Sequence, residues 1–235
     1  MREALAAGGL EVLYAEPGRR PELEAAAAAA GVPVVPVTAA VLAAMGETVT
    51  PQGVLGVAGL VDVRLADALS PAPSPGPSAS LRLVAVLHEV ADPGNAGTVL
   101  RSADAAGAGA VVLTEGSVDP HNGKCVRATA GSLWHLPVVS GAPLPDVVAA
   151  CRAAGLQVLA TTGAGADDLD DLADDGVLRA PTAWLFGNEA AGLPDAALVL
   201  ADRRVRVPLH GRAESLNLAG AAAVCLYASA RAQRR

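Results

Sequence analysis

A series of short apolar runs, separated by segments with helical character, constrains the fold of this chain more than any other feature. A short continuous apolar run is typical of a strand buried on both faces. The runs are LVAVL (83–87), AVVLT (110–114), LQVLAT (156–161), AWLFG (183–187) and RVRVPL (204–209). Helical stretches are predicted near 95–106, 122–130, 144–154 and 214–232. This alternation predicts an α/β fold, a parallel sheet with helices on both faces.

Composition agrees with this fold class. Hydrophobic residues make up 52 % of the chain but aromatic residues only 2 %, so the core is expected to consist mainly of Val, Leu and Ala. The cysteines are far apart and are interpreted as reduced thiols: Cys125, Cys151 and Cys225. No signal peptide or membrane-spanning run is evident, which predicts a soluble, cytoplasmic protein.

The chain is predicted to contain a small N-terminal module, a linker and a larger C-terminal domain. Residues 66–80, ADALSPAPSPGPSAS, lack an apolar period and are interpreted as a Pro/Ser-rich linker. The preceding module, 1–65, alternates strands and helices but begins abruptly and looks N-terminally short. Its strands are expected at 11–15, 32–37 and 54–63, and its helices at 22–30 and 38–45. Prolines in the second strand predict an edge position, and Thr38 is expected to cap the second helix.

Polar residues follow the first apolar run of the C-terminal domain, 81–235. Ligands of open α/β sheets lie at the carboxyl ends of the strands, so these residues are candidates for a site. After Pro93-Gly94, Asn95 is expected to cap a helix, and Arg101 lies about 120° from it around the helix axis. The pair could flank one site. The alternative is a helix cap and a solvated arginine.

Two later segments have the same character. In WLFGNEAAGLP (184–194) a strand ends at Gly187 and the polar Asn188-Glu189 follows, although an ordinary turn would also look like this. In VRVPLHGRAESLNLAG (205–220), Ser215 and Asn217 stand at the start of the last helix. Ser215 alone would be explained as a helix cap, but a polar Asn217 inside an apolar helix start is less well explained that way.

Common nucleotide, metal and hydrolase motifs are missing. No phosphate-binding glycine fingerprint opens a helix after a strand, and the partial match at Gly163-Ala164-Gly165 is followed by acids that would repel phosphate. The histidines lack the spacing of metal ligands, and Ser215 has no His–Asp partner pattern. The net charge of −7 gives no support for nucleic-acid binding, so any such contact must come from a local arginine cluster.

Taken in order, the polar segments resemble the signature motifs of the SpoU (TrmH-type) family of RNA methyltransferases in the SPOUT superfamily. The matching stretches are NAGTVLRSA (95–103), LFGNEAAGL (185–193) and VPLHGRAESLNLAGAAAV (207–224). The resemblance implies a C-terminal deep trefoil knot, a rare exception to unknotted topology. It also implies S-adenosylmethionine bound in the knot loops and a homodimer through the methyltransferase domain. The N-terminal module resembles the family's ribosomal-protein-like substrate-binding domain, with QGVLGVAGL (52–60) at its end.

The implied reaction is methyl transfer to a ribose 2′-hydroxyl of RNA. The catalytic positions carried over by the motifs are Asn95, Arg101, Glu189, Ser215 and Asn217. The cofactor-binding positions are Thr161, Gly163, Phe186, Gly187, Val207, Leu209, Ser215 and Leu216. The sequence departs from the family at Ala190-Ala191, where glycine is frequent, and at Leu209, where methionine is frequent. Both changes are conservative in size.

Because arginine is effectively always protonated, Arg101 is expected to stabilise the developing alkoxide rather than to act as a base. Asn95 and Ser215 would orient Arg101 or the ribose, and Glu189 and Asn217 would hold the loop geometry around the pocket. RNA-binding candidates are Arg19, Arg20, Lys124, Arg127, Arg203, Arg204, Arg206 and Arg212.

Ribosomal RNA is favoured as substrate, with tRNA, or a role in self-resistance to a ribosome-targeting antibiotic, as further possibilities. A non-catalytic RNA-binding or ribosome-assembly protein and a nicotinamide-dependent enzyme are the competing hypotheses.

Overall fold

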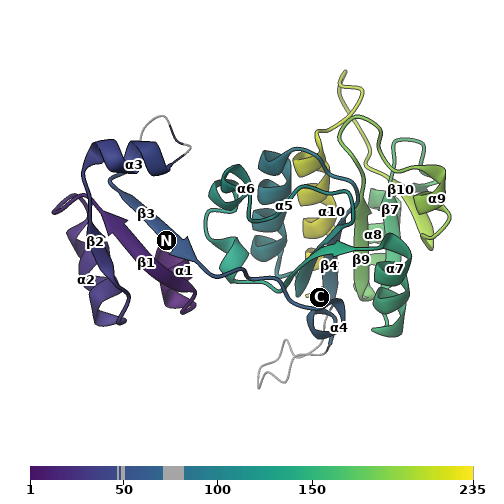
Figure 1. Ribbon diagram of the computed structural model, residues 1–235. Helices are drawn as coiled ribbons and strands as arrows, with labels where there is room; N and C mark the ends of the chain where they lie inside the picture. The colour runs from purple at the N-terminus through teal and green to yellow at the C-terminus, as the bar shows by residue number, and fades with distance from the viewer. Residues whose placement is uncertain (47, 49–50, 71–81, 235) are drawn as a thin grey trace. The chain divides into compact units, whose positions relative to one another are not determined.

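The computed structural model describes residues 1–46, 48, 51–70 and 82–234 (Figure 1). The chain divides into two units, Met1–Val61 and Asp62–Arg235. The predicted α/β alternation is present in both units, although several boundaries differ from those expected.

The first unit is a small sheet flanked by helices. Its strands are ordered β2-β1-β3, with β2 parallel and β3 antiparallel to β1. The edge position of β2 confirms the interpretation of its prolines. Thr38 caps α3 as predicted, because its hydroxyl accepts a hydrogen bond from the Val41 backbone N–H at 3.3 Å. The elements are α1 (Arg2–Ala6), β1 (Leu10–Ala15), α2 (Pro21–Ala29), β2 (Val34–Pro36), α3 (Ala39–Met45) and β3 (Val54–Ala58).

The second unit contains the larger sheet. Its strands are β4 (Leu83–Leu87), β5 (Ala110–Thr114), β6 (Val138–Ala142), β7 (Gln157–Thr161), β8 (Asp167–Asp168), β9 (Thr182–Phe186) and β10 (Arg203–Arg206). Its helices are α4 (Leu65–Ala68), α5 (Pro93–Ala106), α6 (Gly123–Ala128), α7 (Leu144–Ala153), α8 (Leu169–Asp174), α9 (Asp195–Leu198) and α10 (Leu218–Gln233), with 3₁₀ turns at Ser132–Trp134 and Val177–Arg179.

The strands of this sheet pair in parallel in the order β6-β5-β4-β9-β7-β10-β8. The predicted parallel sheet is therefore confirmed. Strand β9 inserts between β4 and β7, so its carboxyl end adjoins that of β4, with Leu87 opposite Phe186. Strand β6 was not predicted, because VVSGA has a short apolar run followed by polar residues. Strand β10 ends at Arg206, earlier than the predicted 209.

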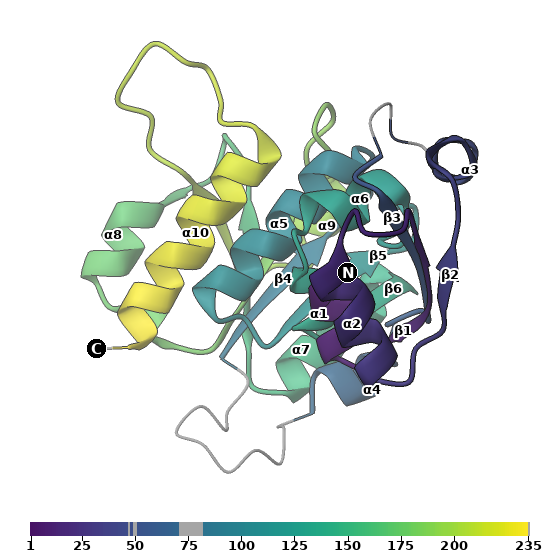
Figure 2. The ribbon, with the colours of Figure 1, turned by 90° about the vertical axis from the view of Figure 1, so that its left-hand side faces the viewer.

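Helices cover both faces of the sheet. On one face α4, α7 and α9 pack on alternate strand residues in one apolar cluster. On the other face α5 and α10 lie side by side, with α6 against α5 (Figures 1 and 2). Trp184 of β9 donates a buried hydrogen bond to the Ser229 hydroxyl of α10 at 2.9 Å. This bond and the surrounding apolar contacts bury one side of α10.

The predicted linker 66–80 needs a correction at its start. Residues 65–68 form helix α4, and Ala68 and Leu69 are only 4 % exposed within the apolar cluster. The chain just before α4 also joins the sheet edge, because Val63 donates to the Val138 carbonyl at 2.9 Å. Burial of two apolar side chains was sufficient to order a segment that lacks an apolar period. Residues 71–81 lie outside the described residues.

Both helices that carry motif residues begin differently from the prediction. Helix α5 is capped by Asp92, whose carboxylate accepts from the Asn95 backbone N–H at 2.8 Å, so Asn95 lies inside the first turn. Helix α10 is capped by Asn217, which accepts from the Gly220 N–H at 2.7 Å. Ser215 is therefore not the cap. Asn217 does not lie inside the helix either, and its polarity is explained by the cap.

Candidate active site

The motif segments follow the carboxyl ends of β4, β9 and β10. Because β4 and β9 are neighbours, the start of α5 and the loop after Phe186 lie together. Strand β10 lies two positions farther along the sheet, and its loop, residues 207–216, leads into α10 beside α5. The arrangement matches the general rule that ligands bind at this edge of an α/β sheet.

The carboxylate of Glu189 links the first two segments. It accepts hydrogen bonds from the backbone N–H groups of Ala91 and Asp92, each at 3.2 Å, and from the Asn95 side chain at 3.1 Å. All these partners donate, which suits an ionised carboxylate because it can accept hydrogen bonds but cannot donate them. The structure thus brings together two of the predicted catalytic residues, Asn95 and Glu189.

The pKa of the Glu189 carboxyl lies below its ordinary value. Partial burial acts to raise it, but hydrogen bonds from Asn95 and from backbone N–H groups, including those of Ala91 and Asp92, outweigh that effect. The carboxylate is consequently held ionised at neutral pH. Its role in this geometry is to fix the loop and to orient the Asn95 amide.

Asn188 fixes the same loop from the other side. Its side-chain N–H donates to the Glu89 carbonyl at 2.8 Å, and its oxygen accepts from Ala190 and Ala191. Its backbone pairs with that of Gly192 in both directions, closing a tight hairpin. At Gly187 an added Cβ would lie 2.4 Å from the Gly192 carbonyl carbon, so only glycine fits there.

The remaining predicted catalytic residues are exposed. Arg101 lies on α5, and Ser215 lies in the loop before α10. Neither side chain forms a hydrogen bond or ion pair with any residue that the structure describes. The structure therefore leaves the Arg101 guanidinium available to an outside ligand but does not join it to Asn95 or Ser215.

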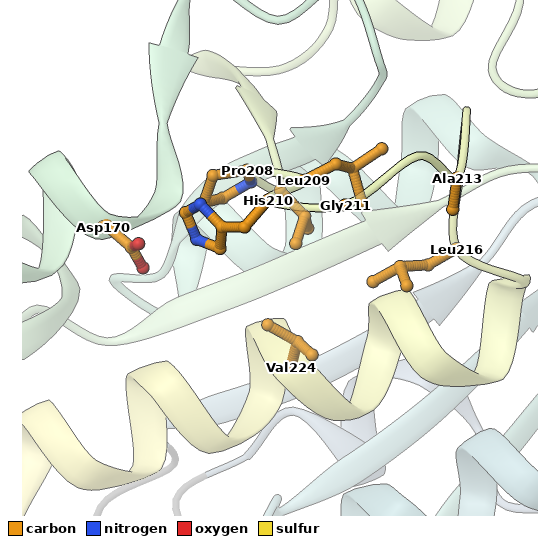
Figure 3. Close-up of a pocket in the computed structure, with 9 residues that line it drawn as sticks. Asp170, Pro208, Leu209, His210, Gly211, Ala213, Leu216 and Val224 are labelled. Carbon is orange, nitrogen blue, oxygen red and sulfur yellow. The ribbon is translucent and has the colours of Figure 1, made fainter.

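A pocket of about 410 Å³ opens beside the loop 207–216 (Figure 3). Its walls are mainly apolar, and it includes three of the predicted cofactor positions, Val207, Leu209 and Leu216. Figure 3 shows Asp170 and His210 toward one end and Leu216 toward the other, with Val224 of α10 below. The lining residues are Asp170, Val207, Pro208, Leu209, His210, Gly211, Ala213, Leu216 and Val224.

The backbone of this loop is unpaired within the described part of the chain. Residues 207–216 form no backbone hydrogen bond with any part of the chain that the structure describes. Polar backbone groups that remain unpaired beside an apolar pocket are available to a ligand. The volume of the pocket lies within the range of small-molecule sites.

Comparison with known proteins identifies the family. Residues 82–227 match the family model described as the SpoU rRNA Methylase family. The chain belongs to this family. The match spans all the motif segments and most of the second unit.

Two named relatives and one solved structure agree with this assignment. The chain is 39 % identical over 184 residues to the 23S rRNA (guanosine(2553)-2'-O)-methyltransferase RlmP of Bacillus subtilis, covering 78 % of this chain and 67 % of that protein. It is 41 % identical over 143 residues to the 23S rRNA (uridine(2479)-2'-O)-methyltransferase of Streptomyces viridochromogenes, covering 59 % and 49 %. The crystal structure of the SpoU methyltransferase AviRb from Streptomyces viridochromogenes in complex with AdoMet superposes with a TM-score of 0.81 at 29 % identity, covering 99 % of this chain and 87 % of that one.

The other predicted cofactor positions lie in different surroundings. Thr161 ends β7 and Gly187 follows the neighbouring β9, and the Thr161 hydroxyl donates to the Leu185 carbonyl at 3.2 Å. Gly163 has open space beside its Cα. The ring of Phe186 is fully buried near Trp184, and its carbonyl accepts from the His88 N–H at 2.8 Å.

Several RNA-binding candidates already have partners. Arg203 and Arg206 pair with Asp167 and Asp168, each at 3.1 Å. In the first unit Arg20 donates to the Gln52 carbonyl and side chain. The candidates that are exposed and form no ion pair with described residues are Arg19, Arg20, Arg127, Arg204 and Arg212.

Asp92, Asn188 and Asp170 were not among the predicted site residues. Asp92 and Asn188 adjoin motif residues and belong to residue types that cap turns, which was the available signal. Nothing local marked Asp170, because only the packing of α8 brings it to the pocket. No helix among the described residues is long and apolar enough to cross a membrane, and no cluster suited to a metal ion occurs among them.

Proposed function

We propose that this protein transfers a methyl group from S-adenosylmethionine to a ribose 2′-hydroxyl of ribosomal RNA. The observation that carries the proposal is the hydrogen bond by which Glu189 of the second motif holds Asn95 of the first motif. Membership of the SpoU rRNA Methylase family and the relatives named as rRNA 2′-O-methyltransferases support the reaction class.

The pocket beside residues 207–216 is the proposed cofactor site. Its volume falls within the range of small-molecule sites, and its apolar lining suits the adenine ring. The unpaired backbone of the loop would bind the polar edge of the ring and the amino-acid part. The cofactor supplies an activated methyl carbon, so the protein has to bind, align and manage one proton.

Asn95 and Arg101 are proposed to act on the ribose. One Asn95 side-chain N–H donates to Glu189, and its Oδ1 can accept a hydrogen bond from the 2′-hydroxyl. Transfer would form the O–C bond and break the methyl–sulfur bond to give S-adenosylhomocysteine, while the hydroxyl proton would pass to solvent water and negative charge would develop on the 2′ oxygen. The exposed Arg101 guanidinium stabilises that charge, and Ser215 and Asn217 position the loop around it.

The catalytic set is proposed to assemble within a trefoil knot and a homodimer. The close passage of Gly165 past β10, where an added Cβ would lie 2.5 Å from the Arg206 nitrogen, is consistent with threading of the chain there. Val224 and Tyr227 of α10 are 43 % and 52 % exposed. They stand nearly one turn apart on one side of the helix, and a second copy would cover them.

RNA is proposed to bind at exposed arginines and at the N-terminal unit, in the cytoplasm where ribosomal RNA lies. Arg127, Arg204 and Arg212 are the candidates in the second unit, and Arg19 and Arg20 those in the first. Because these contacts would be electrostatic, binding should weaken steeply as salt rises.

The test is transfer of labelled methyl from S-adenosylmethionine to ribosomal RNA. We expect label in the RNA with the wild-type protein and its loss in Arg101→Ala. Arg101→Lys is expected to recover little activity, because a lysine lacks the planar fork of donors. Near-native turnover of Arg101→Lys would refute the proposed role of the guanidinium. Absence of label with wild-type protein on naked RNA and on ribosomal subunits would refute the function.

A further inference from the structure

Lys124, the sole lysine of the chain, lies against the motif region rather than free in solvent. Its ammonium is 2.6 Å from one carboxylate oxygen of Asp92. The other oxygen of Asp92 accepts from the Asn95 backbone N–H at 2.8 Å. One carboxylate therefore connects the start of α6, which carries the lysine, to the first turn of α5, which carries Asn95.

The lysine stem is held where it can make this contact. An added Cβ at Gly94 would lie 3.1 Å from the Lys124 Cε, so the stem passes close over the backbone of α5. The Asn122 side chain caps α6 by accepting from the Lys124 N–H at 2.9 Å. At Gly97 an added Cβ would lie 2.5 Å from the Cys125 carbonyl oxygen, so α6 and α5 are in tight contact one turn away. The two helices thus fix the position of the ammonium.

Two carboxylates hold Asn95, that of Asp92 at its backbone N–H and that of Glu189 at its side chain. The Asp92 N–H also donates to Glu189 at 3.2 Å, so both carboxylates hold the start of α5. Among the described residues the only side-chain cation in contact with either carboxylate is Lys124.

We infer that Lys124 is a positioning residue for the methyl transfer: it holds Asp92, and through Asp92 and Glu189 it fixes the Asn95 side chain toward the ribose. This inference rests on the proposed function. It replaces the sequence-based expectation that Lys124 binds an RNA phosphate. Both side chains of the pair are about half exposed, 56 % and 43 %, so the pair adds little to stability and its effect belongs to the geometry of the site.

The experiment compares Lys124→Gln with Arg127→Gln, which removes the same charge from the same helix without touching Asp92. For Lys124→Gln we expect kcat to fall about tenfold while the KM for RNA and the affinity for S-adenosylhomocysteine change little. Lys124→Arg should restore most of the turnover. Arg127→Gln should raise the KM for RNA instead. A raised KM for RNA with unchanged kcat in Lys124→Gln would assign the lysine to a phosphate and overturn the inference.

A double-mutant cycle tests whether the lysine acts through Asp92. Asp92→Asn keeps an oxygen that can cap α5 but removes the charge. Lys124→Gln should lower kcat no further in this background, because the ion pair is already lost. An equal loss in both backgrounds would refute the coupling.

A readout without turnover separates this inference from the proposed function. In an ¹⁵N-labelled protein, hydrogen exchange of the Asn95 side-chain amide should quicken in Lys124→Gln and stay unchanged in Arg127→Gln. This holds even if no methyl reaches the RNA. Unchanged exchange in Lys124→Gln would show that the lysine does not position Asn95.

Discussion

The loops that follow β9 and β10 differ in how the protein holds them. Residues 187–192 are fixed by the hydrogen bonds of Asn188 and Glu189 to the segment that starts α5. Residues 207–216 form no backbone hydrogen bond with the described chain, and most of them are exposed. The first loop is held by hydrogen bonds within the protein, whereas the second has unpaired backbone groups that can bind a ligand or a partner.

This difference suggests that the two loops have different roles in the proposed active site. The segment that carries Asn95 is positioned before any ligand binds, which lowers the cost of reaching a reactive geometry. The loop at the proposed cofactor pocket becomes ordered when its ligand binds, and the free-energy cost of this ordering lowers the net affinity for the ligand. Binding of cofactor should therefore change the second loop far more than the first.

Hydrogen exchange should show the largest effect. Addition of S-adenosylhomocysteine should slow amide exchange across 207–216 by about tenfold or more, and across 187–192 by less than about twofold. The physical reason is that ligand bonds replace solvent only where backbone groups are unpaired. Exchange followed by mass spectrometry of the peptides measures both loops in one sample. Equal slowing of amide exchange in the two loops would contradict the proposed difference between them.

Glycine substitutions should separate the loops by stability. Gly187→Ala forces a Cβ to within 2.4 Å of the Gly192 carbonyl carbon, so the hairpin must shift, at about 1–3 kcal/mol in the free energy of unfolding. Gly211→Ala is the matched control, because nothing lies within 4 Å of its added Cβ. It should change stability by less than about 0.5 kcal/mol. Chemical denaturation compares them, and similar losses for both would contradict the structure.

The cap of α10 should contribute on a smaller scale. Asn217→Ala removes the acceptor for the Gly220 N–H and should lower the free energy of unfolding by about 1 kcal/mol. Asn217→Asp keeps the acceptor and should restore stability. Methyl transfer by the Asp variant then reports whether the residue also acts on the reaction. If Asn217→Ala were as stable as wild type, the cap would not hold in solution.

Acid should produce the smallest effect, confined to the ordered loop. The pKa of Glu189 is depressed in the folded protein, so its hydrogen bonds stabilise the fold above the unfolded pKa of about 4.3 and are lost as pH falls through the folded value. Glu189→Gln removes this dependence. Its Tm should therefore fall less than that of wild type between about pH 5 and pH 3. Parallel Tm curves for the two proteins would mean that the carboxylate is not held as described.

Much of this organisation followed from the sequence. Continuous apolar runs marked β4, β5, β7 and β9 because a buried parallel strand needs apolar residues on both faces. Strand β6 was missed because its polar second half obscures the run. The linker was predicted to begin too early because its composition concealed Ala68 and Leu69, which become buried only once the sheet exists.

The site could be predicted as a set of residues but not as a set of contacts. The motif order selected Asn95 and Glu189, which the structure joins. It also suggested that Asn95 caps α5, which was wrong because Asp92 provides the cap. A single segment offers several polar residues near a helix start, and backbone geometry chooses among them.

The sequence by itself determined the fold class, the family and the segments that meet at the carboxyl edge of the sheet, since each depends on local pattern and order along the chain. Only the tertiary structure decided which of these residues are bonded to one another. Glu189 reaches Asn95 because β9 pairs with β4, and Lys124 reaches Asp92 because α6 packs on α5. Contacts between segments distant in sequence depend on strand order and helix packing, which no local pattern specifies.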